Sequence, residues 1–337
     1  MGGPSREYFI KVGGDRQVPA KLGYTLLTAL ASEGIFLPTA CGGRGACGLC
    51  RLKVLAGAGP VTETEVARLG DLIGAGYRLA CQIHVDGDLV VDLPAGVLQA
   101  GSIKARLAAM EVLTADIRLF RFELEEPPSI GFTPGQYVRL FCPPYPGSPV
   151  PVTREYSIAS DPAQPNILEL IIRRAPGGIC TRYCFEYLKI GQKVFMSRPE
   201  GQFRLSDTCA PAVFVAGGSG LAPLLAMLYQ LANTHQRRPV TLFFGARTSS
   251  DLYLRERLSS FDRLIQGYRF VPVVAQVGQG EHWDGEIGLV TDAIQRAYKD
   301  LSGHEGYLCG PPGMIDAAIK VLTGLGMPTE RIYYDKF

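Results

Sequence analysis

The chain has 337 residues, of which 47% are hydrophobic, and its 34 Lys and Arg residues nearly balance 32 Asp and Glu residues. This length allows two or three domains with separate cores. The charge is spread without blocks, which gives no electrostatic basis for binding nucleic acid or anionic lipid. No apolar run reaches the roughly eighteen residues of a membrane helix. We therefore expect no membrane span, a cytoplasmic location and a monomer.

The first predicted elements are two short strands, 6–12 and 16–18, and a helix over 25–33 that stops at Gly34. A glycine-rich loop follows, and it carries most of a four-cysteine motif. The spacing is Cys-x5-Cys-x2-Cys with a distant fourth cysteine, which lets four thiolates surround a small inorganic core. The motif predicts a [2Fe–2S] cluster held by Cys41, Cys47, Cys50 and Cys81.

Three other uses of four cysteines compete with this interpretation. Structural zinc sites usually pair two Cys-x2-Cys clips, and the sequence has one. Disulfides would suit a small secreted domain, but the N-terminus has no secretory signal. A Rieske centre needs two His ligands, and His84 has no Cys-x-His partner. The remaining cysteines, Cys142, Cys180, Cys184 and Cys209, are expected to be small buried hydrophobic residues in a reducing compartment.

Two more strands, near 51–57 and 89–94, complete a small sheet packed on a helix, and a linker is expected at 94–106. From 104 to 205 short strands alternate with Pro and Gly turns, which indicates an antiparallel barrel interrupted by one helix at 179–188. From about 210 strands alternate with helices, which indicates a doubly wound α/β domain with a parallel sheet. The predicted domains are 1–97, 98–206 and 207–337.

Two motifs in the barrel region favour a flavin. In the strand REYS, Arg154 would grip a phosphate, Tyr156 would stack on a flat ring, and Ser157 would hydrogen-bond a ring atom. The alternative is an ordinary strand with a surface arginine. The turn before the helix, with Gly177, Gly178 and Thr181, provides a pyrophosphate site. Together the motifs predict a dinucleotide flavin.

Two strand-to-helix turns in the last domain favour a second dinucleotide. The first is GGSGLAP, with Gly217, Gly218, Gly220 and Pro223, and the second is CGPPGM, with Cys309, Gly310 and Pro311. Glycines let a pyrophosphate approach the backbone at the carboxyl edge of a parallel sheet. A lone GGSG is also common as a tight connection.

These motifs resemble the ferredoxin–NADP reductase superfamily, whose flavin signature is Arg-x-Tyr-Ser followed by Gly-x-x-Ser/Thr. The resemblance implies FAD bound by the residues above, with help from Arg173, and nucleotide phosphates at the GGSGLAP turn. It places Cys309 beside the nicotinamide and Arg247 near the adenosine. It also implies that Phe337, in an Asp-x-Phe ending, stacks over the flavin. A core role for Cys309 and a frayed end for Phe337 are the alternatives.

Over its full length the chain resembles ferredoxin-fused reductases, which serve bacterial oxygenases or form the flavin subunit of sodium-translocating NADH:quinone reductase. That subunit has an N-terminal membrane helix, whereas no membrane span is expected in this sequence. A reductase for an oxygenase is therefore the first expectation. Electrons would pass from NADH to FAD, with Ser157, Cys309 and Phe337 at the reacting centre. They would leave through the cluster to a protein acceptor docked near its loop. Asp251, after Arg247, favours NADH over NADPH. An electron donor to a non-oxygenase metalloprotein and a redox sensor are the alternatives.

Overall fold

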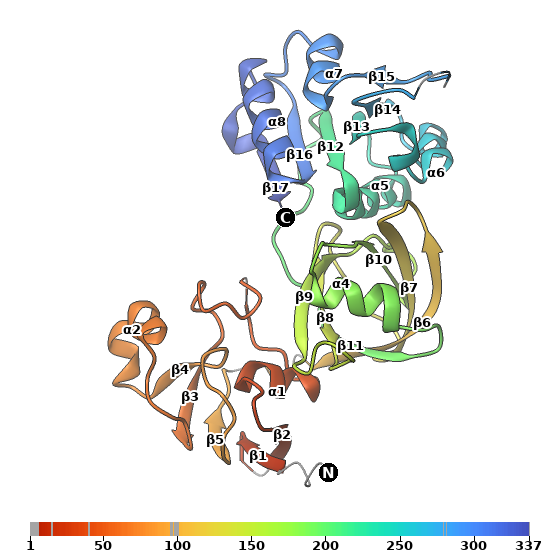
Figure 1. The fold of residues 1–337 in the computed structure, drawn as a ribbon. Helices are drawn as coiled ribbons and strands as arrows, with labels where there is room; N and C mark the ends of the chain where they lie inside the picture. Colours follow the sequence, from red (N-terminus) through yellow and green to blue (C-terminus); the bar gives the residue numbers. More distant parts are fainter. Residues whose placement is uncertain are drawn as a thin grey trace.

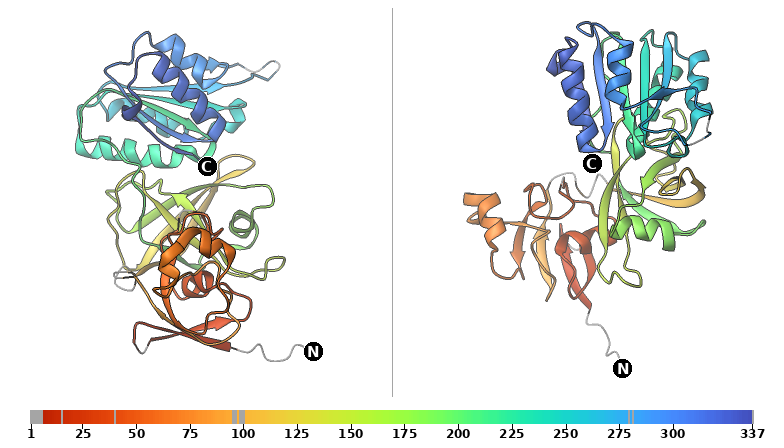
Figure 2. Two further views of the ribbon diagram at one scale, coloured as in Figure 1. Left: turned by 90° about the vertical axis from the view of Figure 1, so that its left-hand side faces the viewer. Right: turned by 45° about the horizontal axis from the view of Figure 1, so that its top comes forward.

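A computed structural model of the chain describes residues 7–14, 16–39, 41–94, 97, 101–278, 280 and 282–336. Their strands form three sheets, each with its own hydrophobic core. Figures 1 and 2 show the three units in a bent row, with the second unit between the first and the third. In the described residues no helix is long and apolar enough to span a bilayer.

The first unit is a five-stranded sheet in the order β2-β1-β5-β3-β4 with helix α1 packed on it, a β-grasp arrangement. Thr25 caps α1 by accepting a hydrogen bond from the amide of Thr28 at 3.2 Å. Helix α2, helix η1 and strand β4 were not predicted, and β2 is longer than expected. The elements are β1 (Glu7–Val12), β2 (Arg16–Lys21), α1 (Leu26–Ser32), β3 (Arg51–Ala56), α2 (Glu63–Leu69), η1 (Gly70–Ile73), β4 (Tyr77–Leu79) and β5 (Leu89–Asp92).

The second unit is a six-stranded antiparallel sheet in the order β10-β7-β6-β11-β8-β9. A bridge between Ile158 and Leu170 joins its two ends, so the sheet curls into a barrel around a core that includes Phe120 and Phe122. The linker was predicted to extend over 94–106, and its predicted C-terminal end is wrong because β6 begins at Ser102. The elements are β6 (Ser102–Val112), β7 (Ile117–Glu126), β8 (Tyr137–Cys142), β9 (Val152–Ser157), β10 (Ile167–Arg173), α4 (Ile179–Arg182), η2 (Tyr183–Tyr187) and β11 (Lys193–Ser197).

The third unit is an all-parallel sheet in the order β15-β14-β13-β12-β16-β17. One face packs on α5 and α6 and the other on α7 and α8, which makes it doubly wound. The elements are β12 (Ala212–Gly217), η3 (Gly218–Gly220), α5 (Leu221–Thr234), β13 (Val240–Ala246), η4 (Ser249–Asp251), α6 (Arg255–Ser260), η5 (Phe261–Arg263), β14 (Tyr268–Val274), β15 (Glu286–Ile287), α7 (Val290–Ala297), β16 (Glu305–Gly310), α8 (Pro312–Gly324), η6 (Thr329–Arg331) and β17 (Ile332–Lys336).

Strand order reverses at the centre of the third sheet. The chain moves outward from β12 to β15 and then returns to place β16 on the other side of β12. The loops that leave β12 and β16 therefore separate at the carboxyl edge and open a crevice between them. Such switch points bind ligands in open α/β sheets.

Candidate functional site

The four predicted cluster ligands come together as two pairs of sulfur atoms. The Sγ atoms of Cys50 and Cys81 are 3.4 Å apart. The Cys41 and Cys47 thiols interact with each other, and the Thr39 hydroxyl lies 4.0 Å from each of their sulfurs. Two pairs of cysteine sulfurs are what a cluster of two iron atoms requires, because each iron takes two thiolates.

The charge state of two of these thiols, Cys41 and Cys81, also suits metal ligation. Burial opposes ionisation of Cys41, but hydrogen bonds from Cys47, Ala46 and Arg44 outweigh it and lower its pKa to about 6. The Cys50 thiol donates to Cys81 and lowers the pKa of Cys81 to about 7, while the pKa of Cys50 itself is raised. Thiolates are the form that binds metal. The residues present therefore fit the cluster that the spacing predicts.

The REYS strand lines a cavity of about 470 Å³ between the barrel and the third unit. Its lining residues are Tyr137, Arg154, Glu155, Tyr156, Ser157, Ile171, Ser219, Ala222 and Asp335. Among the described residues, the buried Tyr156 hydroxyl and Glu155 Oε1 are two polar atoms with no hydrogen-bond partner. Buried polar groups of this kind are usually satisfied. The cavity therefore fits a flat ligand with polar edges, such as a flavin.

A second cavity of about 420 Å³ opens at the turn that carries Gly177 and Gly178. It is also lined by Arg174 and Arg182, whose guanidinium groups both pair with Glu186. The Thr181 hydroxyl donates to the carbonyl of Gly178 and accepts from the amide of Ala175, both at 3.2 Å. The glycines and arginines make the cavity suitable for phosphate, and Thr181 holds the turn in shape.

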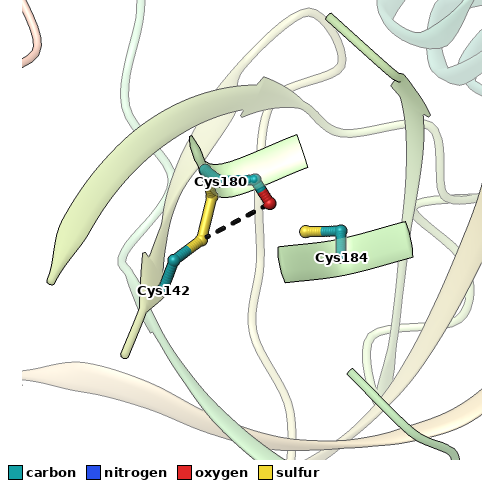
Figure 3. A group of neighbouring side chains, drawn as sticks. All are labelled: Cys142, Cys180 and Cys184. Atoms are coloured by element: carbon teal, nitrogen blue, oxygen red, sulfur yellow. Dashed lines mark hydrogen bonds between the residues drawn. A yellow bond between two sulfur atoms is a disulfide. The ribbon is translucent and has the colours of Figure 1, made fainter. Parts of the chain in front are cut away.

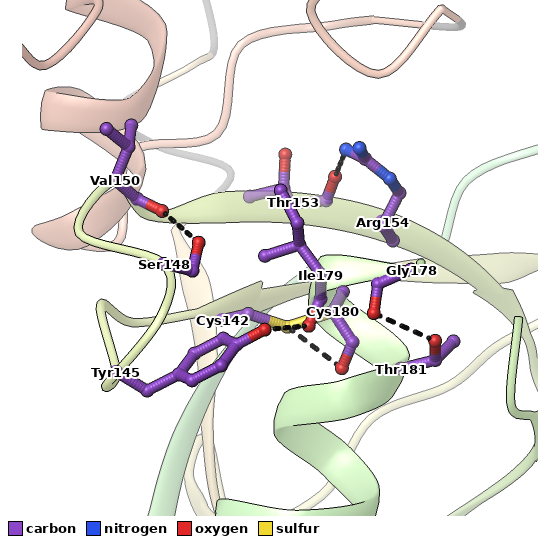
Figure 4. The surroundings of a disulfide bond; sticks show 10 residues. All are labelled: Cys142, Tyr145, Ser148, Val150, Thr153, Arg154, Gly178, Ile179, Cys180 and Thr181. Atoms are coloured by element: carbon purple, nitrogen blue, oxygen red, sulfur yellow. Dashed lines mark hydrogen bonds between the residues drawn. A yellow bond between two sulfur atoms is a disulfide. The ribbon is translucent and has the colours of Figure 1, made fainter. Parts of the chain in front are cut away.

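Three cysteines lie behind this turn. Cys142 ends β8, and its sulfur is bonded to that of Cys180 in α4, with 5.7 Å between the two Cα atoms. The sulfur of Cys184 lies within 4.8 Å of both (Figure 3). Figure 4 shows the disulfide beside the turn of Gly178. The prediction that these cysteines are buried is confirmed for Cys142, Cys180 and Cys184, although the bond between the first two was not expected, and it is wrong for Cys209, which is exposed.

The largest of the three cavities, about 510 Å³, lies at the switch point of the parallel sheet and against the barrel. Gly217, Gly218 and Pro311 line it, as does Arg173 at the end of β10. Arg173 Nε is 2.8 Å from Asp116 Oδ2, and this guanidinium outweighs the effect of burial and lowers the pKa of Asp116. An arginine beside a glycine turn suits a pyrophosphate.

Arg247 and Asp251 line another side of this cavity. Arg247 Nε lies 3.7 Å from Asp251 Oδ2, and the arginine side chain is 76% exposed. The acidic partner leaves little positive charge for a further phosphate group on the nucleotide.

Other predicted residues pack the turns and do not line the three cavities. A Cβ atom on Gly220 would lie 2.1 Å from the carbonyl oxygen of Cys309, and one on Gly310 would lie 2.9 Å from the carbonyl oxygen of Gly217. Only glycine allows the two loops to approach in this way. Pro223 is buried in the first turn of α5.

Two residues, Cys309 and Phe337, were predicted to lie at the nicotinamide, and the structure describes only the first of them. The Cys309 side chain is fully buried in the apolar core, and burial raises its pKa, so it is a neutral thiol. Phe337 lies outside the described residues, and its role stays a prediction. The sequence reasoning missed Asp116, Arg174, Glu155 and Asp335. Arg174 and Glu155 are sequence neighbours of predicted residues, whereas Asp116 and Asp335 meet them only through the fold.

Comparison with protein families divides the chain into the same three parts. Residues 10–86 match the 2Fe-2S iron-sulfur cluster binding domain. Residues 104–205 match the oxidoreductase FAD-binding domain, and residues 214–320 match the oxidoreductase NAD-binding domain. The chain is therefore an oxidoreductase that uses a [2Fe–2S] cluster, FAD and an NAD cofactor.

Relatives match the chain from end to end. The electron transfer component XylA of the xylene/toluene monooxygenase of Pseudomonas putida is 33% identical over 99% of this chain and 95% of its own. One of the subunits of the Na(+)-translocating NADH-quinone reductase of Neisseria meningitidis serogroup C is 29% identical over 97% and 91%.

Solved structures agree. The Amycolatopsis cytochrome P450 reductase GcoB has a TM-score of 0.67 and 32% identity over 98% of both chains. The ferredoxin reductase of carbazole 1,9a-dioxygenase has a TM-score of 0.66 and 26% identity over the whole of both. The chain therefore belongs to the ferredoxin-fused members of the ferredoxin–NADP reductase superfamily.

Proposed function

We propose that the chain takes electrons from NADH and delivers them singly through its [2Fe–2S] cluster to the metal-containing terminal component of an oxygenase. The full-length match to an electron transfer component of a monooxygenase carries this proposal. The order of the three units supports it, because the flavin barrel lies between the nucleotide crevice and the cluster loop. No observation favours a pure redox sensor, which needs no complete nucleotide crevice.

The overall reaction balances as one NADH for two one-electron acceptors. NADH loses a hydride and becomes NAD⁺, two acceptor molecules are each reduced by one electron, and one proton is released. FAD, when bound, accepts the hydride as two electrons and can pass them on one at a time, which a nicotinamide cannot do.

The chain's own residues bind and orient these groups. Ser157 and Tyr156 would hold the edge of the flavin ring. Glu155 Oε1, which has no hydrogen-bond partner in the protein, would accept a hydrogen bond from the ring. Arg174 would hold the flavin phosphates. Arg173, which the resemblance placed at FAD, lines the neighbouring cavity and would hold the nucleotide phosphates there. The Arg247–Asp251 pair favours NADH, because Asp251 would repel the 2′-phosphate of NADPH.

The cluster loop has an inner side and an outer side. On the inner side a Cβ atom on Gly42 would lie 3.4 Å from Arg154 Nη1, so the loop touches the wall of the flavin cavity. On the outer side Arg44 is exposed and Leu49, between two ligand cysteines, is 46% exposed. We propose that the acceptor docks over this outer side, where an exposed apolar residue and an arginine suit a protein partner.

Purified protein with FAD and its cluster tests the proposal directly. NADH should reduce ferricyanide and cytochrome c, and NADPH should do so with a much lower kcat/KM. Iron content should be close to two per chain. A protein that holds FAD and iron but does not oxidise NADH with either acceptor would contradict the proposed activity. Efficient turnover with a corrinoid or other non-oxygenase metalloprotein, and none with any oxygenase component, would contradict the proposed partner.

A further inference from the structure

Arg139 is a charged residue buried where the cluster unit meets the barrel. It lies on β8 and is 2% exposed. Its Nη2 atom is 2.6 Å from Glu200 of the barrel, while Nη1 donates to the backbone carbonyl of Leu37 in the cluster unit. Burying a guanidinium is costly unless it is paired and hydrogen-bonded. Glu200 balances the charge from within the barrel, and the Nη1 donor finds its acceptor in the cluster unit, so all donors of this buried group are satisfied only when the two units are together.

Apolar side chains surround this contact. Ala31 and Phe36 of the cluster unit pack against Phe141 and Phe195 of the barrel in a small cluster of their own. The Arg139 guanidinium lies 5.5 Å from the centre of the Phe36 ring, which adds a cation–π contact. Figure 1 shows α1 and the segment after it against the end of the barrel that carries β8, β9 and β11.

The contact lies close to the cluster ligands. Leu37 is four positions before Cys41, and Thr39 between them lies 4.0 Å from two ligand sulfurs. At the other end of this segment, Gly42 approaches Arg154 in the wall of the flavin cavity. The carbonyl held by Arg139 and the glycine beside Arg154 therefore bracket Cys41. A loop held by a hydrogen bond at one end and packed against the barrel at the other is restricted in its distance from the flavin cavity.

We propose that Arg139 is a positioning residue that holds the cluster loop at the flavin cavity, so that electrons cross between the two. The inference rests on the proposed function, because a fixed distance matters only if electrons pass from the barrel to the cluster. It predicts that loss of Arg139 slows reduction through the cluster and leaves reactions at the flavin unchanged.

The test compares Arg139→Gln with a matched control, Arg121→Gln. Arg121 also forms an arginine–glutamate pair within the barrel, with Glu169 at 3.1 Å, whereas Arg139 in addition donates to Leu37 of the cluster unit. For Arg139→Gln we expect NADH–ferricyanide turnover within about twofold of wild type and NADH–cytochrome c turnover lower by about tenfold to a hundredfold, the range for lost positioning. Arg121→Gln should change neither.

Hydrogen exchange gives a readout that does not depend on turnover. In protein without nucleotide, a peptide covering 31–39 should exchange faster in Arg139→Gln, while peptides from the parallel sheet should not change. Equal cytochrome c turnover and equal exchange in Arg139→Gln and wild type would overturn the inference. If wild type itself reduced ferricyanide but not cytochrome c, the proposed function would fail instead.

A second variant covers the case in which Arg139→Gln does not fold. Phe36→Ala removes the ring from the cluster side of the contact without changing the barrel. It should lower cytochrome c turnover and speed exchange over 31–39 while ferricyanide turnover and FAD content stay at the wild-type level. A Phe36→Ala protein with wild-type cytochrome c turnover and exchange would overturn the inference.

Discussion

Arg173 is the last residue of β10 and Arg174 follows it directly, yet the two line different cavities. Arg173 lines the crevice at the switch point and pairs with Asp116 at 2.8 Å. Arg174 lines the cavity at the Gly177 turn and pairs with Glu186. Successive residues of a strand point in opposite directions. The chain thus presents one cation to each of two phosphate sites from a single strand end.

These two arginines should separate nucleotide binding from flavin retention. Arg173→Gln should raise the KM for NADH by about tenfold or more, the usual effect of losing a hydrogen bond to a charged group, with FAD content unchanged. Arg174→Gln should release FAD during purification, and activity should return when FAD is added. Steady-state kinetics and the flavin-to-protein ratio measure the two effects. Loss of FAD from Arg173→Gln with an unchanged KM would reverse this assignment.

A cysteine substitution should separate the cluster from the flavin. Cys50→Ser removes one sulfur of the Cys50–Cys81 pair, and a hydroxyl is a poor substitute for a thiolate ligand. We expect loss of iron and of cytochrome c turnover, while FAD content and ferricyanide turnover are retained. The control is Cys209→Ser, which changes an exposed cysteine and should leave iron content unaltered. Iron content, visible absorption and the two assays provide the measurements.

The sequence predicts best those parts of the site that local spacing determines. Cys41, Cys47 and Cys50 lie in one loop, and the glycine turns follow buried strands, so their chemistry is visible without the fold. Helix α2 could also have been predicted from the sequence, because Thr62 and Glu65 have the spacing of a capping box and form one in the structure. This signal was overlooked rather than absent.

Other parts of the site depend on contacts between distant segments. Arg139 would be placed at the surface by its polarity, yet it is buried against Leu37, 102 residues away. Asp116 reaches Arg173 across 57 residues. Neither periodicity nor local motifs report which charged residue finds a partner at that separation, because the pairing arises from strand order and domain docking.

The close approach of the two nucleotide-side loops predicts a strict need for glycine at Gly220. Its φ is −62°, so alanine would suit the backbone, but the added Cβ would lie 2.1 Å from the carbonyl oxygen of Cys309. Gly220→Ala should force β16 and the start of α5 apart, lowering both thermal stability and affinity for NADH. The matched control is Gly324→Ala at the end of α8, which meets no atom within 4 Å and should stabilise the helix by about 0.5–1 kcal/mol.

The Gly220 prediction is measured by thermal unfolding and by titration with NADH. Because steric overlap and not backbone conformation is the cause, Gly220→Ser should be at least as destabilising as Gly220→Ala. An alanine variant with unchanged melting temperature and unchanged KM would show that the two loops can move apart without consequence.

A buried ion pair at the edge of the parallel sheet where β13 and β16 begin predicts that acid destabilises the third unit. Glu305 is 3% exposed and pairs with Arg238, which is fully buried. Burial of Glu305 opposes its ionisation, but hydrogen bonds from Ser206, Tyr307, Thr208 and Arg238 outweigh it and lower its pKa to about 2. A carboxyl group with a lowered pKa in the folded state stabilises the fold fully above its unfolded pKa of about 4.3. That contribution is lost as the pH falls from about 5 towards 2.

Glu305→Gln leaves the Arg238 charge without its carboxylate and should lower the free energy of unfolding at pH 7 by about 3–5 kcal/mol. The difference from wild type should narrow below about pH 4, because the wild-type carboxyl then becomes protonated too. Urea unfolding followed by the fluorescence of Trp283, the single tryptophan of the chain, reports on this unit. Asp316→Asn, which removes an exposed pair with Lys336, is the control and should cost at most about 1 kcal/mol. A Glu305→Gln deficit that stays constant from pH 7 to pH 3 would contradict the prediction, because it would mean that the pKa of Glu305 is the same in the folded and the unfolded protein.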